Sequence, residues 1–83
     1  MKTPTIHTNG TGRADLLAKA EAASRAVCDA IDALIELAPN GRDFYPQGPD
    51  AIKTATAEWG VLVDRLKSVV DEVQAYWIAI DEA

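Results

Sequence analysis

The most constraining feature of this 83-residue sequence is a pair of apolar repeats with helical spacing. In each repeat, apolar residues recur at alternating intervals of three and four, the pattern of helices that pack lengthwise against one another. The first repeat comprises Leu16, Ala20, Ala23, Val27, Ala30, Leu34 and Leu37. The second comprises Ile52, Ala55, Trp59, Leu62, Leu66, Val69, Val73, Tyr76 and Ile80. The two repeats predict an all-α fold built from two long amphipathic helices.

Turn-forming residues set the limits of these helices. Pro39-Asn40-Gly41 stops the first helix, which we expect over about 13–38 with Thr11 or Gly12 as its cap. Pro49 is typical of a first helical position, so the second helix is expected over about 49–82. The chain is therefore predicted to be one domain (1–83), an antiparallel helical hairpin with an irregular arm (1–12) and an inter-helix loop (39–48).

The second helix is longer than the first by roughly 12 Å at ~1.5 Å per residue. We place this overhang beside the start of the first helix. There the arm can fold back over Tyr76, Trp77 and Ile80, with Ile6 as its apolar anchor.

The second helix is more apolar than a two-helix structure needs. Val63, Val70 and Trp77 form a further row at heptad spacing, so the apolar face is broader than one partner helix covers. A chain this short supplements a small core with disulfides, metals or oligomerisation. The single cysteine, Cys28, is interpreted as a small buried hydrophobe, and the single histidine, His7, excludes a zinc cluster. We therefore predict a homo-oligomer, at least a dimer, forming a helical bundle; the alternative is a monomer whose third layer is the arm.

Charge and hydropathy exclude several classes of partner. The net charge is −5, and the arm is the only net-positive segment, so the basic stripe of a duplex nucleic-acid binder is absent. No apolar run is long enough to span a membrane, and the N-terminus lacks the apolar region of a signal peptide. We expect a cytoplasmic protein (in the host cytoplasm if it is viral) with no membrane association, no metal and no cofactor.

The first candidate site is the segment His7-Thr8-Asn9-Gly10-Thr11-Gly12-Arg13. Glycines before a helix allow turns whose N–H groups converge, and the helix dipole favours an anion there. The predicted ligand-binding residues are His7, Asn9, Gly10, Thr11 and Arg13. The alternative is an ordinary entry loop that caps the helix.

The second candidate site is the loop from Asn40 to Gly48. Arg42, Phe44, Tyr45 and Gln47 can stack a planar ring and hydrogen-bond its edge. The alternative is that Phe44 and Tyr45 close the end of the bundle while Arg42 pairs with Asp43. The two sites lie about 39 Å apart at ~1.5 Å per residue, so one ligand can reach both only where an antiparallel dimer joins the loop of one chain to the arm of the other.

Together the two segments resemble a family of short phage and prophage proteins of unassigned function. That family has an H-x-N-G-[TS]-x-R opening and an N-G-R-D-[FY]-Y-P-Q-G loop, matched here by His7–Arg13 and Asn40–Gly48. Gly12 stands where the family often has serine, which removes one hydroxyl from the candidate anion site. The resemblance implies a viral origin. In outline the chain is also similar to small viral proteins that sequester nucleotide signals, without a shared motif.

The predicted function is that of a phage binding protein, not an enzyme, with no catalytic residue. It would sequester a small anionic, nucleotide-like host immune signal in pockets between protomers. The alternative is an inhibitor of a host defence complex that acts through its acidic helices, as a nucleic-acid mimic or a surface blocker.

Overall fold

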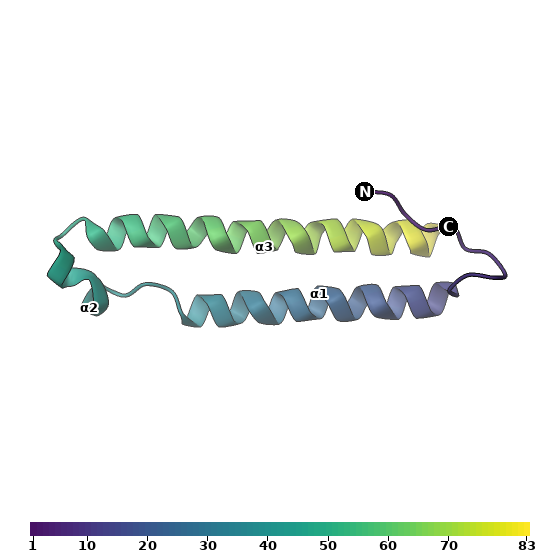
Figure 1. The fold of residues 1–83 in the computed structure, drawn as a ribbon, viewed down its shortest axis with the longest axis horizontal. Helices are drawn as coiled ribbons and strands as arrows, with labels where there is room; N and C mark the ends of the chain where they lie inside the picture. Colours follow the sequence, from purple (N-terminus) through teal and green to yellow (C-terminus); the bar gives the residue numbers. More distant parts are fainter.

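The computed structural model describes residues 1–83, and all of its regular structure is helical. The elements are α1 (Arg13–Glu36), α2 (Gly41–Phe44), the 3₁₀ helix η1 (Tyr45–Gln47) and α3 (Ala51–Glu82). α1 and α3 lie side by side and run in opposite directions, with α2 at one end and the N-terminal arm at the other (Figure 1). The molecule measures 62 × 18 × 16 Å. The predicted all-helical fold, with one long helix pair, is confirmed.

The ends of the long helices differ slightly from the prediction. α1 ends at Glu36, two residues early, and α3 begins at Ala51, two residues late. Pro49 is therefore not the first helical residue, because Asp50 is the N-cap of α3. Gly48 has a φ of 109°, which favours glycine, and its carbonyl accepts from the Ala51 N–H at 3.4 Å. This turn redirects the chain before the helix begins.

The apolar row of α3 that packs against α1 is not the expected one. On α3 the more buried side chains include Trp59, Val63, Leu66, Val70, Val73 and Trp77, whereas Leu62 and Val69 are 37% and 38% exposed. Trp59 and Trp77 are five turns apart at ~3.6 residues per turn and so point the same way. Burying both indoles rotates Val63 and Val70 toward α1. The prediction that Leu62 and Val69 lie on the principal seam is therefore wrong.

Two side chains tie α1 to α3 and define how the helices align. The Trp59 Nε1–H donates to the Leu34 carbonyl oxygen at 2.7 Å, and the Arg13 guanidinium donates to the Ala83 carbonyl oxygen. The start of α1 is thus level with the end of α3. The overhang consequently lies at the start of α3, opposite to the prediction, because residues 41–47 fold into α2 and η1 and cover that end.

The interior of the helix pair is small. Only Ala20 and Ile80 are buried, at 8% and 1% exposure. The arm returns along the end of α3, as expected (Figure 1). Met1 lines a groove with Tyr76. Cys28 is exposed, contrary to the prediction, since the neighbouring Val27 takes the position facing α3. No helix is both long and apolar enough to cross a membrane.

The two tryptophans give a matched test of the helix alignment. Trp59→Phe removes the hydrogen bond to Leu34, whereas Trp77→Phe removes a buried indole N–H that has no partner. We expect Trp59→Phe to lower the free energy of unfolding by about 1 kcal/mol more than Trp77→Phe does, because only the first loses a hydrogen bond. Urea unfolding at one fixed protein concentration measures the difference. Equal losses would show that the Trp59 bond contributes nothing.

Candidate functional site

The arm approaches α1 through a tight turn at His7. The Gly10 N–H donates to the His7 carbonyl oxygen at 3.2 Å, and a Cβ at position 10 would stand 2.6 Å from the His7 Nε2. The imidazole lies against the Gly10 Cα, and a side chain at position 10 would require the exposed imidazole to turn away. His7, Asn9 and Thr11 are exposed, and their side chains make no hydrogen bond within the chain. The turn therefore holds the predicted arm residues on the outer surface.

Gly12, one of the two expected caps, is the N-cap of α1. Its backbone is extended, and no side chain caps the helix. The first N–H groups of α1 are consequently open toward the end of the molecule, where a helix dipole favours an anion. Asp15 lies in this first turn and pairs with Lys19 at 3.2 Å. Its carboxylate competes with any anion bound at the same helix end.

Arg13 has a structural role that the sequence did not indicate. Its guanidinium donates to the Ala83 carbonyl oxygen, past the end of α3. A cation is favourable at this position because the last carbonyl groups of a helix carry partial negative charge. Arg13 thus uses part of its hydrogen-bonding capacity to hold the two helix ends together, and the predicted arm residues whose side chains form no hydrogen bond are His7, Asn9 and Thr11.

The inter-helix segment is a folded unit where an irregular loop was expected. The Asn40 Oδ1 accepts from the Asp43 N–H at 3.1 Å, and the Asn40 Nδ2 donates to the Asp43 Oδ2 at 2.9 Å. This reciprocal pair starts α2, and η1 follows directly. Asp43 is therefore engaged by Asn40, and the expected alternative of an Arg42–Asp43 ion pair is wrong. The Asn40-x-x-Asp43 spacing is the sequence feature that could have predicted this capped helical turn.

The two aromatic residues of this segment point to different environments. Tyr45 is 78% exposed, whereas Phe44 is half-buried. Phe44 lines a groove of about 750 Å³ with Leu37, Pro39, Trp59 and Leu62. The structure thus favours the packing alternative for Phe44. Arg42 and Tyr45 are three residues apart in continuous helical backbone, so they share one outer side, with Gln47 exposed beyond them.

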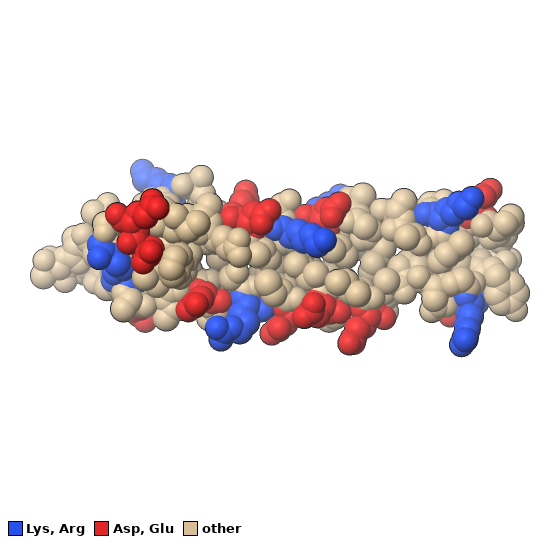
Figure 2. Space-filling view, turned by 180° about the vertical axis from the view of Figure 1, so that it is seen from behind, with Lys and Arg blue, Asp and Glu red and all other residues tan.

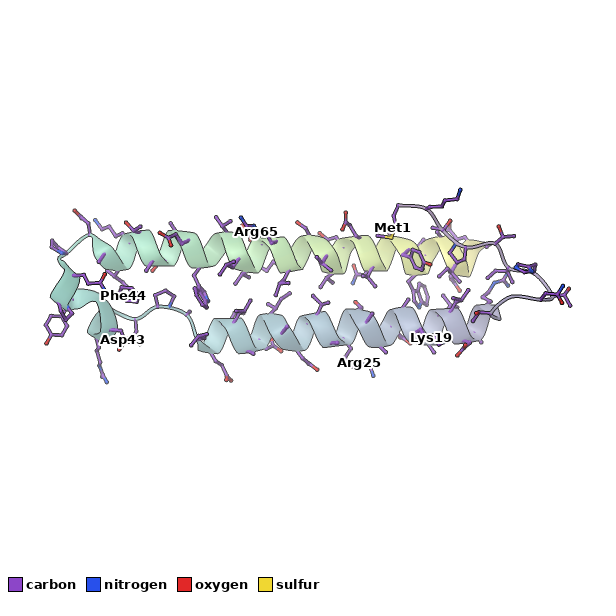
Figure 3. The ribbon with its side chains drawn as sticks, in the orientation of Figure 1. Met1, Lys19, Arg25, Asp43, Phe44 and Arg65 are labelled. Carbon is purple, nitrogen blue, oxygen red and sulfur yellow. The ribbon has the colours of Figure 1, made fainter.

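The arm and the α2–η1 segment lie at opposite ends of the molecule. Met1 marks one end region and Phe44 the other in Figure 3. The molecule is 62 Å long, so no small ligand bridges the two segments within one chain. No three His, Cys, Asp or Glu side chains come together as metal ligands. What the ends offer is surface hydrogen bonding, one exposed aromatic ring and one free guanidinium.

Comparison with protein-family models, with curated proteins and with solved structures gives no match. The function of the chain is therefore inferred from the side chains that the fold presents.

Replacing Asn40 tests whether α2 is held by its cap. Asn40→Ala removes both side-chain hydrogen bonds to Asp43, and we expect a loss of about 1 kcal/mol of stability. The Asp43 amide should exchange with solvent faster, which hydrogen exchange followed by NMR measures. Asn9→Ala is the control, because Asn9 is exposed and its side chain has no partner. Unchanged exchange at Asp43 in Asn40→Ala would mean that other contacts hold this segment.

Proposed function

We propose that this protein is a binding protein that sequesters a small anionic molecule with a planar ring, such as a nucleotide. One observation carries the proposal: a capped, folded segment presents Tyr45 at 78% exposure, one helical turn from Arg42. An exposed tyrosine offers another molecule both an aromatic face for stacking and a hydroxyl for hydrogen bonding.

The chemistry of this surface suits a ring more than a bare anion. The Tyr45 ring and the Arg42 guanidinium can each stack on a planar base, and the Gln47 amide can donate to and accept from its edge. Phe44 acts behind this surface by packing against the helix pair. The ligand-facing set of the loop is accordingly Arg42, Tyr45 and Gln47.

The arm supplies groups suited to the charged part of such a ligand. His7, Asn9 and Thr11 are exposed and free of intramolecular hydrogen bonds, and the uncapped start of α1 lies beside them. Gly10 serves by letting the imidazole lie close to the backbone. Arg13 keeps donors beyond the one given to Ala83 and adds positive charge at this end.

Because the arm and the loop are at opposite ends, a complete site requires two copies of the chain. The proposal is that the loop of one copy takes the ring while the arm of the other takes the anion. Each dimer then has two equivalent pockets.

Thermal stability in the presence of nucleotides tests this function. A ligand that binds only the native protein at one hundred times its Kd adds about 2.7 kcal/mol of stability, so the Tm should rise measurably. Arg42→Ala and Tyr45→Ala should each abolish the rise. Arg25→Ala, which removes an exposed guanidinium from the middle of α1, is the control and should keep it. Native mass spectrometry of the protein from its natural cells should show the retained ligand, and the absence of a shift across a nucleotide panel would contradict the proposal.

A second candidate function is supported by charge on α1. Asp29, Asp32 and Glu36 are exposed, at helical spacing along one side, and none forms an ion pair. Acidic groups predominate along the α1 edge of the molecule (Figure 2). This edge could cover a basic surface of another protein. The combined Asp29→Asn, Asp32→Asn and Glu36→Gln variant should then lose that partner while nucleotide binding is untouched, as judged by co-purification in low and high salt.

A further inference from the structure

One side of the helix pair has apolar residues at heptad spacing on both helices. We call it the apolar face, and its residues are Leu16, Ala23 and Ala30 on α1, the α1 C-cap Leu37, and Leu62, Val69 and Tyr76 on α3. The two rows lie on the same side, because Leu37 and Leu62 line one groove while Ala23 and Tyr76 line another. Leu37, Leu62 and Val69 are 69%, 37% and 38% exposed. This face is therefore apolar and uncovered along the middle of the molecule.

The opposite side of the helix pair differs in chemistry. Its groove includes Glu21, Ser24 and Gln74 beside Trp77. Two turns before Gln74, at heptad spacing, α3 carries Lys67, which is exposed. This groove thus mixes polar side chains with the apolar Trp77 and Ile78, whereas the two rows of the first side are apolar throughout.

We infer that a second copy of this chain covers the apolar face, packed antiparallel about a two-fold axis. The α1 row reads Leu, Ala, Ala, Leu in both directions, so it is symmetric about the point midway between Ala23 and Ala30. The α3 row is centred on Val69. The Trp59–Leu34 and Arg13–Ala83 bonds align the helices so that these two centres are at nearly the same height. One axis can therefore serve both rows.

Side-chain size fits this arrangement. The axis would stack Leu16 on Leu37 of the second copy and Leu62 on Tyr76 of the second copy. Ala23 and Ala30 lie at the centre of α1, where small side chains permit close approach of two helices. The whole side spans 62 by 18 Å, roughly 1,100 Å². A standard interface buries about 800 Å² of accessible surface per partner, so the second copy has to cover most of this side.

Charge at the edge of the face is complementary under the same axis. Glu58, Arg65 and Glu72 follow at heptad spacing beside the α3 row, and Arg65 lies on the side of α3 turned away from α1 (Figure 3). None of the three forms an ion pair within the chain. The antiparallel axis sets Arg65 opposite Glu72 of the second copy, and the pair occurs twice. A parallel arrangement, in which α3 lies on α1 of the second copy, does not bring these two together.

This dimer also completes the proposed site, and in that respect it rests on the proposed function. Met1 and Leu16 line a groove at the arm end, while Leu37, Pro39 and Phe44 line the groove at the loop end. The two-fold axis places the loop end of each copy beside the arm end of the other. The surface with Arg42 and Tyr45 is then adjacent to His7 and Thr11 of the second copy.

Charge reversal tests the register. Arg65→Glu and Glu72→Arg should each weaken the dimer roughly tenfold in Kd, because each change turns two attractive pairs into two repulsive ones. The double variant should restore the wild-type Kd. Sedimentation over a range of concentrations measures the Kd, and circular dichroism at each concentration reports whether the helices remain folded. Failure of the double variant to restore binding would overturn the antiparallel pairing.

Cysteine cross-linking tests the face without depending on charge. In a Cys28→Ser background, Val69→Cys lies at the proposed axis and Lys67→Cys on the opposite side. A short bis-maleimide should link Val69→Cys into dimers and leave Lys67→Cys monomeric. Linking at position 67 alone, or a monomer at all concentrations, would overturn the inference. Both readouts are independent of nucleotide, so a dimer that binds no nucleotide refutes only the proposed function, and a nucleotide-binding monomer refutes only the interface.

Discussion

The alignment of α1 along α3 is the constraint on which the rest of the structure depends. It is set by two large indoles on one line of α3, one of which donates to the Leu34 carbonyl, and by Arg13 at the far end. This alignment determines which apolar row of α3 is enclosed and which remains outside. It also leaves the first turns of α3 beyond the end of α1, where α2 and η1 pack. Only Ala20 and Ile80 are buried, so the alignment fixes the relative position of the helices but encloses only a small core.

Much of this architecture could be predicted from the sequence. The repeats and the residues Pro39, Gly41 and Pro49 predicted the two helices nearly to their ends. The row that faces α1 could not be chosen, because Leu62 and Val69 match Val63 and Val70 in hydrophobicity and in spacing. In the structure, the packing of the bulky Trp59 and Trp77 indoles against α1 determines that Val63 and Val70 face α1. The position of the overhang likewise depends on α2 being folded, which the Asn40-x-x-Asp43 spacing only suggests locally.

The candidate residues were only partly predictable for a related reason. Composition located the two segments, and the fold keeps them at opposite ends, as the chain length along α1 required. Whether an individual side chain can bind a ligand depends on whether it packs against the helices or faces solvent. Phe44 and Tyr45 are adjacent in sequence, yet one packs against the helix pair and the other faces water. Arg13 donates a hydrogen bond to the Ala83 carbonyl oxygen at the end of α3. Its positive charge therefore helps to hold α1 against α3 as well as adding to the surface charge.

The proportions of the molecule have a hydrodynamic consequence. A body of 62 × 18 × 16 Å is a rod more than three times as long as it is wide, and it experiences more friction in water than a sphere of equal mass. A single chain will therefore elute from a sizing column ahead of globular standards of its weight. Two chains packed side by side would double the width without adding length. The shape would become more compact as the mass doubled, so elution volume would change less than the mass does.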